Sequence, residues 1–254
     1  MAILFFDIDG TLAIGTNVPA SAAEAIARTR EKGNLVFICT GRPRTYAEAH
    51  FGVYADGFVC CNGRLATRGD DIVLDKHVSR ETVDEILAIL DSFDIGYAFF
   101  GVDGLYYGGN EQFRRIAEEV HGELGSLEEA LEEGLDLFSY DIFFRELVDR
   151  DRIAKALTGI SLVNPHGPHP SADLTITGYG KGDAVVDISK NLGVPIEDVY
   201  AFGDGVNDIS MLEAAGTGIA LGNALPEVKE VADYITTDID KDGVANAIAH
   251  FGLA

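Results

Sequence analysis

In the stretch Phe5-Phe6-Asp7-Ile8-Asp9-Gly10-Thr11, an apolar strand ends in two carboxylates. The backbone turns where a strand ends, so Asp7 and Asp9 can converge on one small volume beside the backbone carbonyls. Converging carboxylates repel each other unless a cation or a shared proton lies between them. The stretch therefore indicates a metal that prefers oxygen ligands, with one carboxylate left to react. The same residues also suit an ordinary Asp-Gly turn, in which Asp7 bonds to its own backbone.

The composition is that of a folded protein without paired cysteines. The chain has 254 residues, of which 47% are hydrophobic, enough for one large domain or two modest ones. No stretch approaches the roughly 20 apolar residues of a membrane span, so we expect a soluble cytoplasmic protein. The three cysteines, Cys39, Cys60 and Cys61, lie in apolar strand-like segments and are expected to be reduced core residues.

The chain is strongly acidic. Its formal net charge is −23, from 42 acidic and 19 basic residues. Such an excess argues against nucleic acid or an anionic membrane as a partner. It does not exclude a small phosphorylated metabolite, because a few fixed cations and a metal can dominate within a Debye length of about 8 Å. We expect a monomer or a weak homodimer.

The two ends of the chain alternate strands and helices in the way that builds a parallel sheet. A helix is expected from Ala20 to Lys32, with Pro19 near its start and Gly33 after its end. The expected strands are Ile3–Phe6, Leu35–Cys39, Phe58–Cys61, Val199–Phe202 and Gly218–Leu221. We therefore expect an α/β core around a parallel sheet.

Residues 80–178 have a different texture, typical of an α+β region. Apolar residues in Val83–Leu90 recur at helical spacing. In Leu137–Phe144 aromatic and aliphatic residues alternate with polar ones, so Ser139 and Asp141 share the second face of a strand. We expect a sheet with one apolar face against helices and one free polar face, which would suit a lid over a site.

Polar residues also follow two other strands, at the edge where open parallel sheets bind ligands. Thr40-Gly41-Arg42-Pro43 combines a hydroxyl with a helix N-terminus and could bind an anion, although a simple Thr cap would look the same. Gly203-Asp204-Gly205-Val206-Asn207-Asp208 supplies two carboxylates and an amide, and Asp208 could also cap a helix. Lys181 stands between glycines at the joint where the middle region ends, although a lone lysine is usually a surface residue.

Taken in order, Asp-x-Asp-Gly-Thr, Thr-Gly-Arg, Lys-Gly and Gly-Asp-Gly-x-Asn-Asp resemble the four motifs of the haloacid dehalogenase (HAD) superfamily. The insertion after the second motif, together with Asn62-Gly63, is similar to the Cof-like phosphatases of type IIB, which carry a large α+β cap. The resemblance covers the whole chain. It implies a Rossmann-like parallel-sheet core, residues 1–79 and 179–254, and an inserted α+β cap domain for substrate specificity, residues 80–178.

The resemblance also implies a Mg²⁺-dependent phosphatase that forms an aspartyl-phosphate. Asp7 would be the nucleophile, and Asp9 would act as general acid and then as general base. Thr40 and Lys181 complete the implied catalytic set. The implied metal ligands are Asp7, Asp9, Asp204 and Asp208. The implied phosphate-binding residues are Ile8, Thr40, Gly41, Lys181 and Asn207.

The substrate is expected to be a phosphorylated sugar or polyol, because the polar residues of the expected cap suit hydroxyl groups. The candidates for substrate specificity are Arg42, Arg44, Asn62, Gly63, Asp141, Arg145 and Tyr179. His166 and His169 could suggest a metal pair, but their segment is rich in proline and offers no acidic third ligand.

Other functions remain open at the level of sequence. A phosphomutase or phosphotransferase would use the same acids, whereas a dehalogenase would need neither Asp9 nor a metal. The insertion of about 100 residues and Asp9 count against a signalling protein phosphorylated on aspartate, and Mg²⁺-dependent phosphate release would exclude a sugar-binding module. Phosphate release into water under steady turnover favours a hydrolase.

Overall fold

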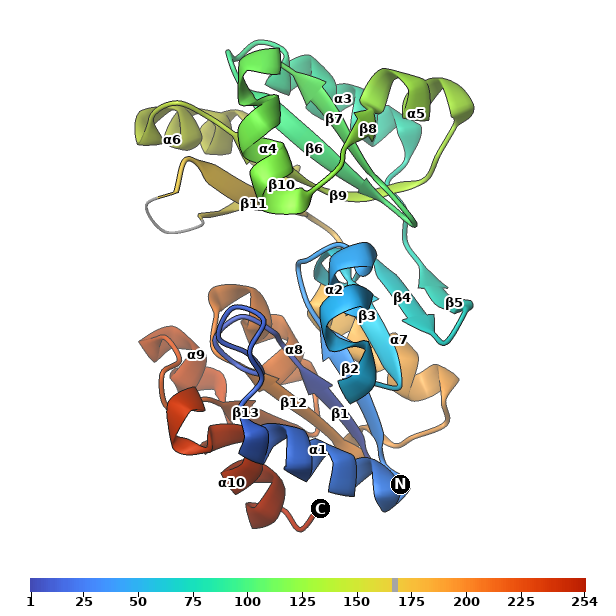
Figure 1. The fold of residues 1–254 in the computed structure, drawn as a ribbon, viewed down its shortest axis with the longest axis vertical. Helices are drawn as coiled ribbons and strands as arrows, with labels where there is room; N and C mark the ends of the chain where they lie inside the picture. Colours follow the sequence, from blue (N-terminus) through green and yellow to red (C-terminus); the bar gives the residue numbers. More distant parts are fainter. Residues whose placement is uncertain (166–168) are drawn as a thin grey trace. The chain divides into compact units, whose positions relative to one another are not determined.

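The computed structural model describes residues 1–165 and 169–254 (Figure 1). The chain divides into two compact units. The first unit comprises Met1–Arg42, Ala47–Asp75 and Gly180–Ala254, and the second comprises Pro43–Tyr46 and Lys76–Tyr179. The expected insertion, residues 80–178, falls within the second unit. His166, considered above as a metal ligand, lies outside the described residues.

The first unit is built on a sheet of eight strands among the described residues, in the order β14-β13-β12-β1-β2-β3-β4-β5. Neighbouring strands from β14 to β3 run parallel, and β4 and β5 are antiparallel additions. The strands are β1 (Ile3–Phe6), β2 (Leu35–Cys39), β3 (Gly57–Cys60), β4 (Leu65–Arg68), β5 (Asp71–Asp75), β12 (Val199–Gly203), β13 (Thr217–Ala220) and β14 (Tyr234–Ile235). All four residues of β1 are fully buried between β2 and β12, as a continuous apolar run predicts.

Helices alternate with these strands along the chain. The helices are α1 (Ala20–Glu31), α2 (Arg44–Phe51), α7 (Lys181–Asn191), α8 (Ile209–Ala214), α9 (Pro226–Val231) and α10 (Gly243–His250). The chain enters α1 at Pro19 and reverses after it at Gly33, whose φ of 82° is readily adopted by glycine. α1 packs beside α10, and α7 packs beside α8. The predicted α/β fold with a parallel-sheet core is confirmed.

The second unit is an α+β unit. Its sheet has six strands among the described residues, in the order β10-β11-β9-β6-β7-β8, all antiparallel except the β7–β8 pair. The strands are β6 (Gly96–Gly101), β7 (Leu105–Gly109), β8 (Gly125–Ser126), β9 (Leu137–Phe143), β10 (Ser161–Pro165) and β11 (Ser171–Ile176). The helices are α3 (Arg80–Leu90), α4 (Arg114–His121), α5 (Leu127–Glu133) and α6 (Leu147–Ala156). Residues of α3 and one face of β9 share an apolar core, as the sequence pattern predicts.

The prediction that β9 has a free polar face is wrong. Ser139 and Asp141 are only 2% and 3% exposed. The carboxylate of Asp141 pairs with His121 at the end of α4, 2.9 Å away, and the His121 ring packs edge-on against Phe100 and Phe143. Alternation along β9 did separate the two faces, but it could not show that α4 covers the second one.

The described residues contain no helix both long and apolar enough to cross a membrane.

Candidate active site

The predicted motif residues of the first unit follow strands that end at one edge of its sheet. Asp7 follows β1, Thr40 follows β2, and Asp204 follows β12. The backbone N–H of Asp7 donates to the carbonyl of Phe202, and that of Thr40 donates to Val59, so the sheet bonding continues into the site. Because these strands are parallel, their polar ends meet at the carboxyl edge of the sheet.

Lys181, the first residue of α7, is the central cation of the site. Its Nζ donates to Asp7 Oδ1 and to Asp208 Oδ1, each at 2.7 Å, and the residue is 1% exposed. Lys181 was predicted to bind phosphate, and in the structure it forms ion pairs with two of the predicted acids, Asp7 and Asp208. The second oxygen of Asp208 accepts from the backbone N–H groups of Asp204 and Gly205, each at 3.0 Å. Asp208 therefore fixes both Lys181 and the loop after β12.

Charge in this cluster is unbalanced towards the acids. Burial, followed by the Asp208 carboxylate, raises the pKa of Asp7 from 3.8 to about 8, against the lowering effect of Lys181. Burial also raises the pKa of Asp204 to about 6, while a hydrogen bond from Thr11 opposes the shift. Burial alone would lower the pKa of Lys181, but Asp208 and Asp7 raise it, so the ammonium stays charged.

The donor set fits a hard divalent cation. One carboxylate oxygen from each of Asp7, Asp204 and Asp208 lies within 4.8 Å of the others. The candidate ligand atoms of this cluster are all carboxylate oxygens, which are the ligands that Mg²⁺ prefers. Three carboxylates surround one ammonium, so a bound dication would neutralise the two remaining negative charges.

Asp9 lies apart from the buried cluster and is paired with Arg42. Arg42 Nε donates to Asp9 Oδ2 at 3.1 Å, and Nη2 donates to Asp9 Oδ1 at 3.3 Å. The Asp9 side chain is 48% exposed. Arg42 was predicted to contribute to substrate specificity, and in the structure it also holds the carboxylate of Asp9. Ile8 is fully buried, and its apolar side chain has no group to bind a phosphate, so any contact would come from its backbone N–H.

Gly10 and Thr11 hold Asp204, a role that was not predicted from the sequence. Thr11 Oγ1 donates to Asp204 Oδ1 at 2.7 Å. A Cβ on Gly10, whose φ is 84°, would lie 2.3 Å from Asp204 Oδ2. The motif around Asp7 thus also positions the side chain of Asp204, almost 200 residues later in the chain.

Thr40, Asn62 and Asn207 line another side of the cluster of motifs. Thr40 and Asn62 are 1% and 2% exposed. Asn207 Nδ2 donates to Asn62 Oδ1 at 3.4 Å, and Thr40 Oγ1 accepts from the N–H of Arg42 at 3.1 Å. The hydroxyl proton of Thr40 can then point to a ligand. A fixed cation, a buried hydroxyl and an amide beside a buried carboxylate suit the transfer of a phosphoryl group.

Comparison with known proteins agrees with this chemistry. Residues 4–248 match the family model described as haloacid dehalogenase-like hydrolase. The chain belongs to the haloacid dehalogenase-like hydrolases.

Relatives of this HAD hydrolase match it over nearly their whole length. YkrA of Bacillus subtilis (strain 168) is 31% identical over 262 residues, covering 99% of this chain and 98% of YkrA. The 5-amino-6-(5-phospho-D-ribitylamino)uracil phosphatase YwtE of the same organism is 28% identical over 283 residues, covering 96% of each chain. The solved structure of the HAD subclass IIB sugar phosphatase BT4131 superposes with a TM-score of 0.82 and 29% identity, covering 100% of each chain. The chain is a Cof-like HAD phosphatase, and the predicted family is confirmed.

The HAD hydrolase's specificity candidates in the second unit each have other contacts. Asp141 is buried against His121, so the prediction that it faces an open surface is wrong. Arg145 donates to Gln112 Oε1 at 3.0 Å and lines a groove of about 440 Å³. The Lys76 ammonium lies 4.9 Å from the centre of the Tyr179 ring. Arg44 donates to Asp103 Oδ1 at 3.0 Å.

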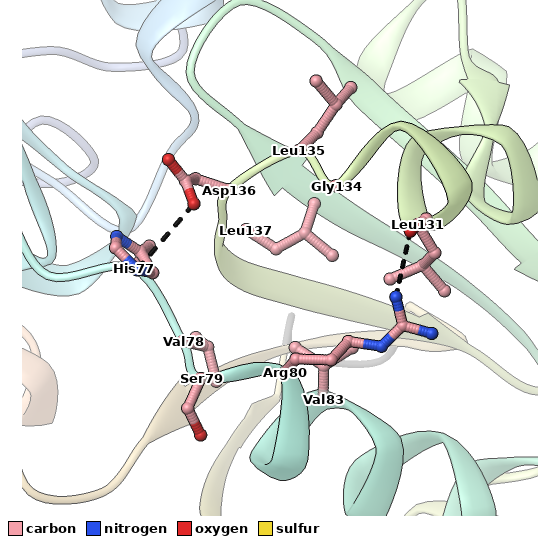
Figure 2. A pocket seen from close by; sticks show the side chains of 10 residues that line it. All are labelled: His77, Val78, Ser79, Arg80, Val83, Leu131, Gly134, Leu135, Asp136 and Leu137. Carbon is pink, nitrogen blue, oxygen red and sulfur yellow. Dashed lines mark hydrogen bonds and ion pairs between the residues drawn. The ribbon is translucent and has the colours of Figure 1, made fainter.

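The HAD hydrolase has a hollow in its second unit that none of the predicted site residues lines (Figure 2). Its volume is about 230 Å³, and it lies between the start of α3 and the segment from Leu131 to Leu137. His77 points toward Asp136 across it, with 3.8 Å between Nε2 and Oδ1, and Arg80 donates to the carbonyl of Leu131. No residue of the four motifs lines this hollow, so the chemistry is assigned to the Asp7 cluster.

Proposed function

We propose that this phosphatase is Mg²⁺-dependent and hydrolyses a small phosphorylated sugar or polyol through an aspartyl-phosphate on Asp7. The observation that carries the proposal is the buried Lys181 ammonium, held at 2.7 Å from both Asp7 and Asp208. A carboxylate attacks a phosphate dianion only when cations offset their mutual repulsion. Lys181 supplies one such cation at a fixed place.

In the first step, an oxygen of Asp7 attacks phosphorus and the bond from phosphorus to the leaving oxygen breaks. Asp9 donates its proton to the departing alkoxide. Asp9 then takes a proton from the water that attacks the aspartyl-phosphate, which releases inorganic phosphate and restores Asp7. The Asp9 side chain, 48% exposed, can reach both the leaving group and water.

The other residues of the site position charge during both steps. Thr40, Asn207, Lys181 and the backbone N–H groups of Ile8 and Gly41 hold the phosphoryl oxygens. Asp7, Asp204 and the backbone carbonyl of Asp9 would bind Mg²⁺, with Asp208 bracing the site, and the metal would neutralise charge on the phosphoryl group.

Relatives support a sugar or polyol phosphate as the substrate. BT4131 is described as a sugar phosphatase, and the substrate named for YwtE carries a phosphorylated ribityl chain. The net charge of −23 disfavours nucleic acid and membranes as partners. We also infer that the enzyme acts in the cytoplasm, as a monomer or a weak homodimer, with residues 1–79 and 179–254 as catalytic core and 80–178 as specificity cap.

The test is a measurement of phosphate release from phosphorylated sugars, polyols, nucleotides and cofactors. The purified protein is assayed with Mg²⁺, with a chelator, and as the Asp7→Asn variant. We expect release from a sugar or polyol phosphate with Mg²⁺, and background rates in the other two cases. Near-normal turnover by Asp7→Asn would refute the nucleophile. A phospho-enzyme that returns its phosphoryl group to sugar without releasing phosphate would instead indicate a phosphomutase.

A further inference from the structure

The turn after β3 has a backbone conformation that residues with a side chain rarely adopt. Cys61, Asn62 and Gly63 are three consecutive left-handed residues, with φ of 55°, 54° and 101°. Among the described residues, Asp242 is the one other non-glycine residue with positive φ. Left-handed backbone costs energy for residues with a Cβ, although asparagine tolerates it better than most. Such a segment persists when its surroundings hold it, and it often marks a functional site.

The backbone of this turn is held by two of the motifs described above. The N–H of Cys61 donates to the carbonyl of Arg42 at 3.1 Å, and that of Asn62 donates to Thr40 at 3.0 Å. Gly63 packs against the start of α7, because a Cβ there would lie 2.4 Å from the carbonyl oxygen of Gly180. The turn therefore lies directly between the Thr40 segment and the backbone that leads into Lys181.

The side chain of Asn62 extends the same connection to the motif that contains Asn207. Its Oδ1 accepts from Asn207 Nδ2 at 3.4 Å. It also fills the space beside Gly41, where a Cβ would lie 3.0 Å from Oδ1. Asn62 is 2% exposed, so protein atoms surround it on nearly every side. This burial leaves little surface for a bulky leaving group.

We propose that Asn62 is a positioning residue that holds the carboxamide of Asn207 in place for the phosphoryl group. The proposal rests on the proposed phosphatase function, and it replaces the expectation that Asn62 selects the leaving group. The phosphoryl group is common to all substrates, whereas the leaving group differs. A residue that positions the phosphate ligand Asn207 must therefore affect every substrate equally, and its effect must disappear when Asn207 is removed.

The decisive variant is Asn62→Gly, which removes the carboxamide and keeps a residue that adopts φ near 54° without penalty. It is assayed on two substrates of the wild-type enzyme that differ only in the leaving group. We expect kcat to fall about tenfold for both substrates with KM nearly unchanged. Inhibition by inorganic vanadate should weaken by the same factor, because vanadate occupies the phosphoryl position without a leaving group.

A double-mutant cycle tests whether Asn62 acts through Asn207. If it does, the Asn62→Gly/Asn207→Ala protein is as slow as Asn207→Ala alone, within about twofold. The proposal would be overturned if the losses of kcat in the two single variants multiplied in the double variant, or if the losses differed between the two substrates. Either result would indicate a contact with the leaving group. A silent wild-type enzyme would refute the phosphatase function instead, so the two failures are distinguishable.

Asp242→Gly is the matched control, since it makes the same backbone change at another left-handed residue, before α10. It should leave kcat, KM and vanadate inhibition unchanged. Equal losses in Asp242→Gly and Asn62→Gly would mean that glycine at a left-handed position loosens the whole unit, and would overturn the positioning role.

Discussion

Asp7 must be reactive, yet it is buried among other carboxylates. Its raised pKa means that the folded, metal-free protein retains a proton that the unfolded chain loses. Asp7 therefore makes the protein less stable as pH rises from about 4 to about 8, because ionisation in the folded state becomes costly. The nucleophile is in this sense a destabilising residue, as is common for catalytic groups.

We therefore expect Asp7→Asn to raise the melting temperature of the chelator-treated protein. The gain should be small near pH 4, should grow through pH 8, and should level off above it, because only ionised Asp7 is costly. Thermal unfolding followed by circular dichroism at several pH values measures the difference. Asp70→Asn, at an exposed position, serves as the control and should show no such trend. A gain that stayed constant across this pH range would contradict the assignment.

The loop between β13 and α9 supports the segment that carries Asp9. Asn223 in this loop donates through Nδ2 to the carbonyl of Gly10 at 2.9 Å. Its Oδ1 accepts from the N–H of Ile239 at 2.8 Å. One side chain thus ties the Asp9-Gly10 turn to the segment before α10, across more than 200 positions.

Asn223→Asp should lower kcat about tenfold and change the melting temperature little. The aspartate keeps the acceptor for Ile239 but cannot donate to Gly10, so Asp9 loses a fixed position. Asn246→Ala is a matched control, since it removes hydrogen bonds to Thr237 and Lys241 in the same segment without touching Gly10. The control should lower the melting temperature and keep kcat. Full activity in Asn223→Asp would show that this contact does not position Asp9.

Within the second unit, α4 and β9 are joined by the buried pair of His121 and Asp141. Both side chains are 4% exposed, and Asp141 Oδ1 has no hydrogen-bond partner among the described residues. Replacing His121 alone would leave neither oxygen of the Asp141 carboxylate with a hydrogen-bond partner. Breaking a buried pair in this way costs about 3–5 kcal/mol.

We expect His121→Ala to lower the free energy of unfolding by that amount, about 3–5 kcal/mol. His121→Leu combined with Asp141→Leu should recover most of the loss, because no charge then remains buried. Urea unfolding followed by tyrosine fluorescence measures both variants, since the chain has 9 tyrosines and no tryptophan. A loss below about 1 kcal/mol in His121→Ala would mean that the pair is solvated.

The excess of acid over the whole chain makes cation binding a source of stability. Mg²⁺ that binds only the folded protein stabilises it by about 2.7 kcal/mol at 100 times its dissociation constant. We expect the melting temperature to rise with Mg²⁺ in wild type and to rise much less in Asp204→Asn. Sodium chloride at matched ionic strength is the control for general screening. An equal rise in melting temperature in both proteins would show that Asp204 does not bind the metal.

Much of the sheet and the position of the motif residues could be predicted, because residues that follow parallel strands lie at the same edge of the sheet. Asp7, Thr40 and Asp204 each follow an apolar run, and the ends of parallel strands meet. Alternation in β9 likewise separated its two faces correctly. Local patterns of this kind depend only on neighbouring residues.

Contacts between distant segments were the part that the sequence did not reveal. The hydrogen bond from Thr11 to Asp204 and the one from Asn223 to Gly10 depend on side-chain directions that no local period encodes. The cover that α4 places over Asp141 is of the same kind, because it depends on how a helix packs and not on its own pattern. The left-handed backbone at Cys61 was equally hidden, since cysteine carries no signal for it.

The place of β1 between β2 and β12 has a consequence for synthesis on the ribosome. β12 begins at Val199, so nearly four-fifths of the chain is made before β1 gains its second neighbour. Until then one edge of a fully apolar strand stays unpaired, which invites aggregation. Nascent chains stalled before Val199 should therefore bind chaperones, whereas the finished chain, in which β12 has paired with β1, should release them.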